Sequence, residues 1–170
     1  LAERHDRVPN ARCFGMMDVE NKKAMRPDAI FRIYSMSKPI TAVAVLALYE
    51  EGSFLLDDPI KDFLPAFADV QVAEAAENGT VAHVPPRRDI TIHDLLTHTG
   101  GLTYAVVHDA PAKGMDLDAF IPEFCKVPLM HHPGAAWQYS ASSDVLGRLV
   151  EVVSEQPLDA FLQERIFDPL

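Results

Sequence analysis

The feature that most constrains the fold of this chain is an apolar run at residues 40–48, which reads Ile-Thr-Ala-Val-Ala-Val-Leu-Ala-Leu. The run is too short to span a bilayer, so it must be buried in a protein core. We expect a helix from residue 35 to about residue 51 that stops at Gly52, because glycine favours helix C-termini. Such a helix carries the polar residues at its start to the edge of the core.

Ser35 and Lys38 stand at the start of this predicted helix, three residues apart. That spacing places them on one helix face, one turn from each other. A partly desolvated lysine loses its proton more readily and can act as a base, and a serine beside such a base is an activated nucleophile. A helix N-terminus also favours the negative charge that develops when an acyl group is attacked. The pair therefore indicates acyl transfer.

A structural role is the competing interpretation of the same residues. The pattern Ser-x-x-Lys fixes two residues in four and recurs by chance, so Ser35 can be an ordinary helix N-cap and Lys38 a solvated first-turn residue. Ser37 can also cap the helix, but position 40 is Ile. Of the two serines, only Ser35 has a lysine three residues further on, and the register favours Ser35 as the nucleophile.

Tyr139 is the second candidate for the chemistry. It follows a His-Pro-Gly turn at residues 132–134 and precedes a predicted helix at residues 143–153. A tyrosine on a loop just before a helix can present its phenol to a cleft, and near a lysine it can lose its proton and share the work of a base. The alternative is a packed aromatic ring whose hydroxyl is hydrogen-bonded.

Three segments in order along the chain resemble a known superfamily. Residues 31–41 (Phe-Arg-Ile-Tyr-Ser-Met-Ser-Lys-Pro-Ile-Thr) resemble the first motif of the serine β-lactamases and penicillin-binding proteins. Residues 94–102 (Asp-Leu-Leu-Thr-His-Thr-Gly-Gly-Leu) resemble the helix and turn that follow, and residues 132–147 resemble the second motif region. The resemblance runs along nearly the whole chain. It is strongest to the class C branch, and within that branch to the family VIII carboxylesterases, which have a β-lactamase fold.

The resemblance implies an α/β (α+β) fold of the β-lactamase/transpeptidase type, in which helices flank an antiparallel sheet and a helical subdomain is added. It also implies the roles of three residues. Ser35 would be the acylated nucleophile, and its backbone N–H would form half of the oxyanion hole. Lys38 would accept or share its proton. Tyr139 would relay that proton to the leaving group and then activate water for deacylation.

Two departures from the superfamily pattern modify this expectation. The residue two positions after the tyrosine is usually Asn, which binds a substrate amide, but here it is Ala141. An ester presents no such amide, so Ala141 favours an esterase. The third motif, a Lys-Thr-Gly or His-x-Gly triplet that accompanies the second oxyanion-hole donor, does not occur between Tyr139 and Leu170. We therefore expect residues 1–170 to be one partial domain, with a sheet hairpin at 1–34, a mainly helical region at 35–170, and further strands in a missing C-terminal part.

Three functional hypotheses follow. The first is a serine carboxylesterase that hydrolyses short-chain acyl esters through an acyl-enzyme on Ser35. The second is a β-lactamase or D-alanyl peptidase of the same fold, which Ala141 disfavours. The third is a non-catalytic β-lactamase-like module that binds or scaffolds, which the joint presence of Ser35, Lys38 and Tyr139 disfavours. The expected ligand is a small-molecule ester, with a β-lactam as the alternative.

Composition excludes other classes of function. The formal net charge of −10 argues against binding to nucleic acid or to an anionic membrane surface. We expect no cofactor and no metal, because His93 and His98 lie off the helical spacing of a zinc pair and no cluster of cysteines or carboxylates completes a site. No signal peptide is visible, so a cytoplasmic location is expected, with a periplasmic or secreted location as the alternative. The two cysteines, Cys13 and Cys125, are expected to be free buried thiols.

The remaining elements are assigned from local signals. His98 is expected to hydrogen-bond to backbone in its turn, and Arg87 and Arg88 are expected to be a solvated loop pair. The predicted elements are strands at 11–19 and 29–34 joined by a turn at 20–28, a helix start at 57–59, a surface excursion at 66–82, and helices at 91–97, 116–126 with Asp116 as cap, 143–153, and 158–166 after Pro157.

Overall fold

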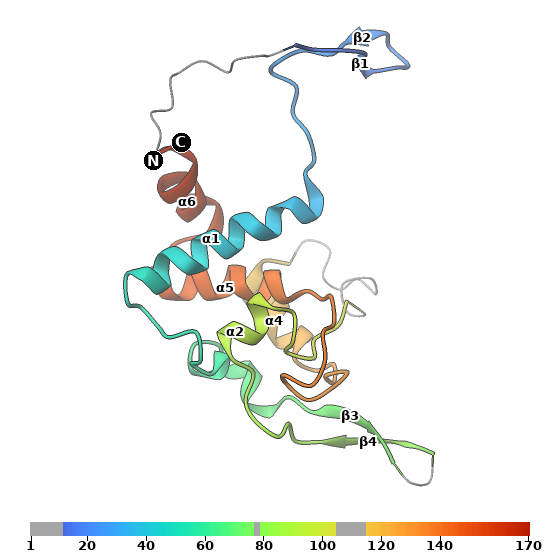
Figure 1. Ribbon diagram of the computed structural model, residues 1–170, viewed down its shortest axis with the longest axis vertical. Coiled ribbons are helices and arrows are strands. Elements are labelled where there is room, and N and C mark those ends of the chain that lie inside the picture. Colours follow the sequence, from blue (N-terminus) through green and yellow to red (C-terminus); the bar gives the residue numbers. More distant parts are fainter. Residues whose placement is uncertain (1–11, 77–78, 105–114) are drawn as a thin grey trace. The chain divides into compact units, whose positions relative to one another are not determined.

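The computed structural model describes residues 12–76, 79–104 and 115–170 (Figure 1). The chain divides into two compact units, residues 1–35 and residues 36–170. We describe each unit separately.

The N-terminal unit contains one short antiparallel hairpin, in which β1 (Met16–Asp18) pairs with β2 (Lys23–Ala24). The Asp18 carboxylate accepts hydrogen bonds from the backbone and side-chain amides of Asn21, at 3.0 and 2.8 Å. This bonding closes the turn early. The predicted second strand at residues 29–34 is therefore wrong, and residues 29–33 pair with no strand in the described part of the chain.

In the larger unit, the apolar run forms the predicted buried helix α1 (Ser37–Glu50), which lies against α5 (Ser142–Ser154) (Figure 1). Thr41, Ala44, Val45 and Leu48 are the buried residues of α1. The helix ends as predicted at Gly52, which has a φ of 79° and donates its N–H to the Tyr49 carbonyl at 2.9 Å.

The start of α1 differs from the prediction by two residues. Ser35 lies in the 3₁₀ helix η1 (Tyr34–Met36), and Met36 is the N-cap of α1. Pro39 explains this difference, because proline has no N–H with which to donate to the carbonyl of the residue four positions earlier. Ser35 therefore precedes the α-helix, and Lys38 lies in its first turn.

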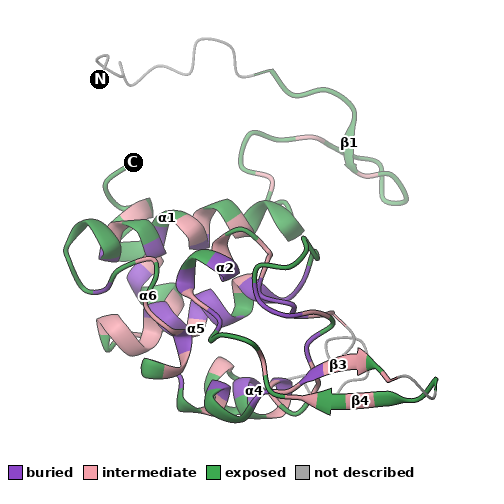
Figure 2. Ribbon diagram, turned by 60° about the horizontal axis from the view of Figure 1, so that its bottom comes forward, coloured by how far each residue is buried: buried purple, intermediate pink, exposed green. Residues whose placement is uncertain are grey.

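The hydrophobic core lies where α1, α2 (Ile92–Leu96) and α5 face one another, as Figure 2 shows by colour. Burying a large aliphatic side chain contributes about 1.5–3 kcal/mol, so these buried side chains stabilise the unit. The largest hydrophobic side chains that are almost fully buried are Ile60, Ile92, Leu95, Leu129, Leu149, Val45, Val72, Val145 and Val150.

Three further helices form as predicted, and side-chain caps begin two of them. In α2, the Thr91 hydroxyl accepts from the Asp94 N–H and the Asp94 carboxylate accepts from the Thr91 N–H, which forms a capping box. In α4 (Leu117–Phe124), the Asp116 carboxylate accepts from the Ala119 N–H at 2.8 Å. The third helix, α6 (Leu158–Leu162), follows Pro157 and continues into the π-helix η4 (Gln163–Phe167).

The segment at residues 57–84 departs from the prediction. The expected helix start at 57–59 leads into the short 3₁₀ helices η2 (Ile60–Asp62) and η3 (Pro65–Asp69). The predicted surface excursion holds an antiparallel hairpin, β3 (Val72–Ala75) with β4 (Val81–Val84).

A long-range contact explains the hairpin. The Leu129 N–H donates to the Gln71 carbonyl at 2.7 Å, and the Ala73 N–H donates to the Leu129 carbonyl at 2.9 Å. Val72 between them is fully buried. Leu129 is remote in sequence from Val72, so local patterns do not reveal this contact.

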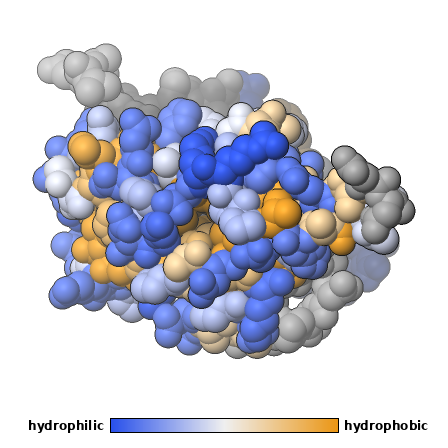
Figure 3. Space-filling view, turned by 90° about the horizontal axis from the view of Figure 1, so that it is seen from below, coloured by the Kyte–Doolittle hydropathy of each residue, from blue (hydrophilic) through white to orange (hydrophobic). Residues whose placement is uncertain are grey.

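The surface and the thiols complete the description. Hydrophilic side chains cover much of the face seen in Figure 3, with hydrophobic side chains in smaller groups between them. Cys125 is half-buried, but Cys13 is exposed, so the expectation that both thiols are buried is wrong for Cys13. Both thiols are free.

Among the described residues, the helices are all too short or too polar to cross a membrane.

Candidate active site

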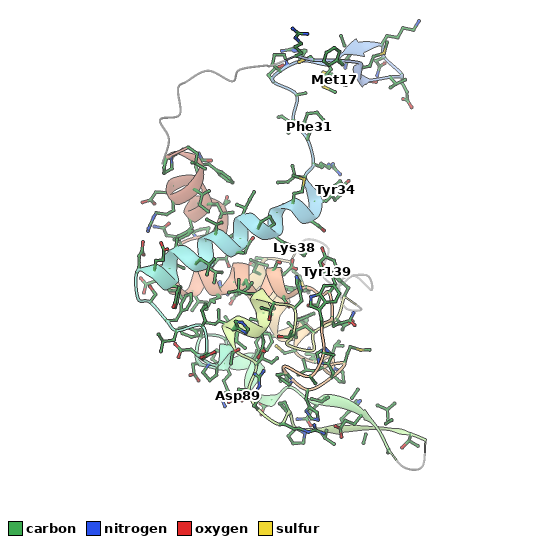
Figure 4. The ribbon with its side chains drawn as sticks, viewed as in Figure 1. Met17, Phe31, Tyr34, Lys38, Asp89 and Tyr139 are labelled. Carbon is green, nitrogen blue, oxygen red and sulfur yellow. The ribbon has the colours of Figure 1, made fainter. Side chains whose placement is uncertain are left out.

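Lys38 and Tyr139 are neighbours in the structure, although they are far apart in the sequence (Figure 4). The Lys38 Nζ atom lies 4.9 Å from the centroid of the Tyr139 ring. It also lies 5.6 Å from the centroid of the Tyr104 ring, and the two tyrosine rings are 5.5 Å apart. The structure therefore brings two of the three predicted catalytic residues together and adds a second tyrosine beside them.

Ser35, the third predicted residue, lies in η1 at the end of the N-terminal unit, and its side chain is exposed. Tyr34 before it has a φ of 47°, in the left-handed region that residues other than glycine seldom adopt. Such a backbone conformation costs of order 1–3 kcal/mol. The link between Ser35 and Lys38 rests on their spacing in the sequence, and the role of Ser35 as nucleophile stays a prediction.

The protonation state of Lys38 differs from the one expected. Burial lowers the pKa of the Lys38 ammonium, but hydrogen bonding to the Tyr104 and Tyr139 side chains and their charge outweigh it, so the pKa is raised above its ordinary value of 10.5. Lys38 is therefore cationic at neutral pH. The expectation that Lys38 loses its proton more readily is wrong for this state of the chain.

The Tyr139 segment is attached to the turn that follows α2. The Gln138 N–H donates to the His98 carbonyl at 2.9 Å, and the Gly134 N–H donates to the Thr99 carbonyl at 2.9 Å. Gly134 has a φ of 80°, which favours glycine at this position. The Tyr139 side chain remains 38% exposed. Two backbone hydrogen bonds therefore present the phenol at the surface without burying it.

His98 makes a contact that the sequence did not predict. It was expected to hydrogen-bond to backbone, but its side-chain Nδ1 lies 3.4 Å from the Ser140 Oγ. The Ser140 Oγ is in turn 2.8 Å from the Ser142 Oγ. Burial, and then the charge of Lys38, lower the pKa of the His98 imidazole below 6.5. His98 is therefore neutral at pH 7.

The turn that carries His98 rests on an ion pair between the buried Asp94 carboxylate and the half-exposed Arg88 guanidinium. The side-chain oxygens of Asp94 accept from Arg88 Nη1 at 2.5 Å, from Arg88 Nη2 at 2.9 Å and from the Thr99 hydroxyl at 3.1 Å. Burial raises the pKa of the Asp94 carboxyl, but the hydrogen bonds from Arg88 and Thr91 outweigh it and the pKa is lowered. The prediction that Arg87 and Arg88 are simply solvated is therefore wrong for Arg88.

Sequence reasoning missed two groups near Lys38. Tyr104 follows the Gly-Gly turn, and its only signal is an aromatic residue directly after a predicted motif. Asp144 lies in the first turn of α5. Burial raises the pKa of its carboxyl, and the charge of Lys38 opposes part of that rise, although the residue reaches solvent. An acidic residue in a first helical turn is the signal that was available for it.

Ala141 is fully buried as the N-cap of α5. Its methyl group cannot donate a hydrogen bond and packs in the core. Within the ranges that the structure describes, no group of three or more His, Cys, Asp or Glu side chains is arranged to hold a metal ion.

Comparison with known proteins now assigns the family. The family model described as "Beta-lactamase" matches residues 3–170. The chain belongs to the beta-lactamase family. Esterase EstB of Burkholderia gladioli is 36% identical over 183 residues, which cover 100% of this chain and 44% of EstB.

Two solved structures are similar to this beta-lactamase family chain. EstCE1, a hydrolase with promiscuous acyltransferase activity, has a TM-score of 0.72 and 29% identity, over 91% of this chain and 41% of EstCE1. A penicillin-binding protein from Bacillus halodurans has a TM-score of 0.73 and 25% identity, over 98% of this chain and 48% of that protein. These matches confirm the predicted superfamily and its β-lactamase/transpeptidase fold. The chain spans less than half the length of each of the three proteins.

Proposed function

We propose that this chain carries the nucleophile and base of a serine carboxylesterase that hydrolyses short-chain acyl esters. The single observation that supports this most is the 4.9 Å approach of the Lys38 Nζ atom to the Tyr139 ring. It pairs a cation with a phenol, which favours proton release from that phenol. The similarity to esterase EstB supports an ester as the substrate.

The proposed mechanism has two half-reactions on Ser35. The Ser35 hydroxyl attacks the acyl carbonyl carbon while its proton passes to the Tyr139 phenolate, which the Lys38 ammonium stabilises. Tyr139 then protonates the departing alcohol as the carbon–oxygen bond of the ester breaks. In the second half-reaction Tyr139 takes a proton from water, the water oxygen attacks the acyl carbon, and Ser35 leaves with the proton returned to its oxygen.

The position of Ala141 supports an ester over a β-lactam. A superfamily member that binds a substrate amide usually has Asn at this position, whereas the Ala141 side chain has no hydrogen-bonding group and is fully buried. The β-lactamase or peptidase hypothesis therefore lacks one group that it needs, and an ester substrate does not need that group.

Hydrolysis of p-nitrophenyl butyrate and of a chromogenic cephalosporin, measured side by side, tests the proposal. We expect ester turnover that the substitution Ser35→Ala abolishes, and little cephalosporin turnover. Ser37→Ala is the matched control, since Ser37 has no lysine three residues further on, and it should keep the activity. Cephalosporin turnover that exceeds ester turnover would show a β-lactamase, and no acylation by either substrate would favour the non-catalytic module.

A further inference from the structure

His98 contacts the Tyr139 segment through both its backbone and its side chain. Its carbonyl accepts the Gln138 N–H at 2.9 Å, and its backbone has a φ of 57°. Its ring centroid lies 5.0 Å from that of Tyr139 and 6.2 Å from that of Trp137. The His98 ring therefore contacts both of these aromatic side chains.

The polar edge of the same ring reaches a buried pair of hydroxyls. The His98 Nδ1 lies 3.4 Å from the Ser140 Oγ, which lies 2.8 Å from the Ser142 Oγ. Each serine is only 1% exposed. Because a buried hydroxyl without a partner is destabilising, this chain of contacts favours one orientation of the residue that follows Tyr139.

The turn beneath His98 is itself fixed. The Thr99 N–H donates to the Asp94 carbonyl at 2.8 Å, and the Thr99 hydroxyl donates to the Asp94 carboxylate at 3.1 Å. Arg88 holds that carboxylate through two hydrogen bonds. These hydrogen bonds hold the turn that carries His98 in one conformation. A residue that orients another side chain needs such support.

We propose that His98 is a positioning residue: its neutral imidazole holds residues 137–140, and with them the Tyr139 phenol, beside Lys38. The catalytic consequence rests on the proposed esterase function, whereas the placement of the segment does not. His98 touches Tyr139 and not the reacting atoms, so it acts through Tyr139.

The neutral form is the one that suits this role. Lys38 of α1 is the charged group that acts on His98, and Tyr139, Trp137 and Ser140 face its ring. Protonation would add a second positive charge near Lys38, and a protonated Nδ1 no longer accepts a hydrogen bond from the Ser140 hydroxyl. Burial and the Lys38 charge both lower the pKa of His98, which keeps the imidazole neutral at pH 7.

Three substitutions separate the contributions. His98→Phe keeps an aromatic ring and removes Nδ1. His98→Asn returns a polar atom near the position of Nδ1, and asparagine tolerates a positive φ. His93→Asn is the matched control, because His93 lies on the exposed side of α2 and hydrogen-bonds through its backbone N–H and carbonyl.

The first measurement needs no substrate. Trp137 is the single tryptophan of the chain, so its fluorescence reports on this cluster alone. Protonating His98 places a cation beside the indole. We expect a pH-dependent change in emission with a midpoint below 6.5, present in the wild type and in His93→Asn and absent in both His98 variants. A wild type without this transition, or a His98 variant that keeps it, would overturn the placement of His98.

The second measurement tests the effect on catalysis. We expect His98→Phe to lower kcat for p-nitrophenyl butyrate by about 10–100-fold, as small displacements of catalytic groups do, with KM changed by less than about threefold. His98→Asn should recover most of the loss. An unchanged kcat in His98→Phe, or a fall in kcat matched by a lower melting temperature and not recovered in His98→Asn, would overturn the positioning role. A wild type without ester turnover would overturn the proposed function, and the fluorescence titration would then decide the placement of His98.

Discussion

The Lys38 Nζ atom and the Tyr139 ring are 4.9 Å apart, because the first turn of α1 and the loop before α5 meet where the two helices pack. A cation at this distance stabilises the charge that a phenol acquires when it gives up its proton. The same pair explains why the pKa of Lys38 is raised in spite of its partial burial. Under the proposed function, we expect Lys38 to act as the charged partner of Tyr139.

Removing the charge of Lys38 should abolish ester hydrolysis. We expect Lys38→Met to lower kcat/KM for p-nitrophenyl butyrate by about 10²–10³-fold, the usual contribution of a group that stabilises developing charge. Lys126→Met is the control, because Lys126 is exposed and its ammonium pairs with Glu123 on the surface. Steady-state measurement of kcat/KM for the two variants tests this prediction. Equal activity in both would remove Lys38 from the mechanism.

The Tyr139 hydroxyl should matter for the rate and little for stability. We expect Tyr139→Phe to reduce kcat by about 10²–10⁴-fold with a nearly unchanged melting temperature, because the side chain is 38% exposed. Tyr49→Phe is matched in exposure, at 38%, and lies at the far end of α1. It should retain full activity. A Tyr139→Phe enzyme as fast as the wild type would leave the phenol without a catalytic role.

Breaking the Asp94–Arg88 pair should destabilise the turn that carries His98. We expect Asp94→Asn to lower the free energy of unfolding at pH 7 by about 1–3 kcal/mol, the cost of unsatisfied buried partners. The cost is smaller than for a fully buried pair because Arg88 is half exposed. Asp89→Asn breaks an exposed pair with Lys61 and should cost less than about 1 kcal/mol. Urea denaturation of the two variants makes the comparison.

The stabilisation from Asp94 also has a defined dependence on pH. Because the pKa of Asp94 is lower in the folded state than its ordinary value of 3.8, the unfolded chain binds more protons in acid. The contribution is complete above pH 3.8 and is lost as the pH falls through the folded-state pKa. The difference between wild type and Asp94→Asn should therefore shrink in that range. A difference independent of pH would contradict the assignment.

The two thiols should differ in reactivity. Burial raises the pKa of the Cys125 thiol to about 12, so it is almost entirely protonated at pH 8. Cys13 is exposed. We expect a thiol reagent such as Ellman's reagent to modify one thiol rapidly in the native chain, and Cys13→Ser to remove that rapid phase. A rapid phase that survives Cys13→Ser would show that Cys125 is accessible.

Local chemistry explains the parts of this protein that its sequence determined. The buried α1 helix, its end at Gly52, the caps at Thr91 and Asp116, and the helical stripe of α5 follow from periodicity and capping, which act over a few residues. The family was also recognisable, because three motifs occur in order with compatible spacing. Ser35, Lys38 and Tyr139 were singled out as candidates on the same basis.

Only the tertiary structure decided which groups meet. The strands β3 and β4 form where Leu129 bonds across to Gln71 and Ala73, and that partner is remote in the chain. The contact of His98 with Ser140 likewise joins segments that are far apart in the sequence. The pKa of Lys38 depends on two tyrosines that lie far along the sequence. Protonation and positioning are set by distances in space, and a local sequence pattern does not specify those distances.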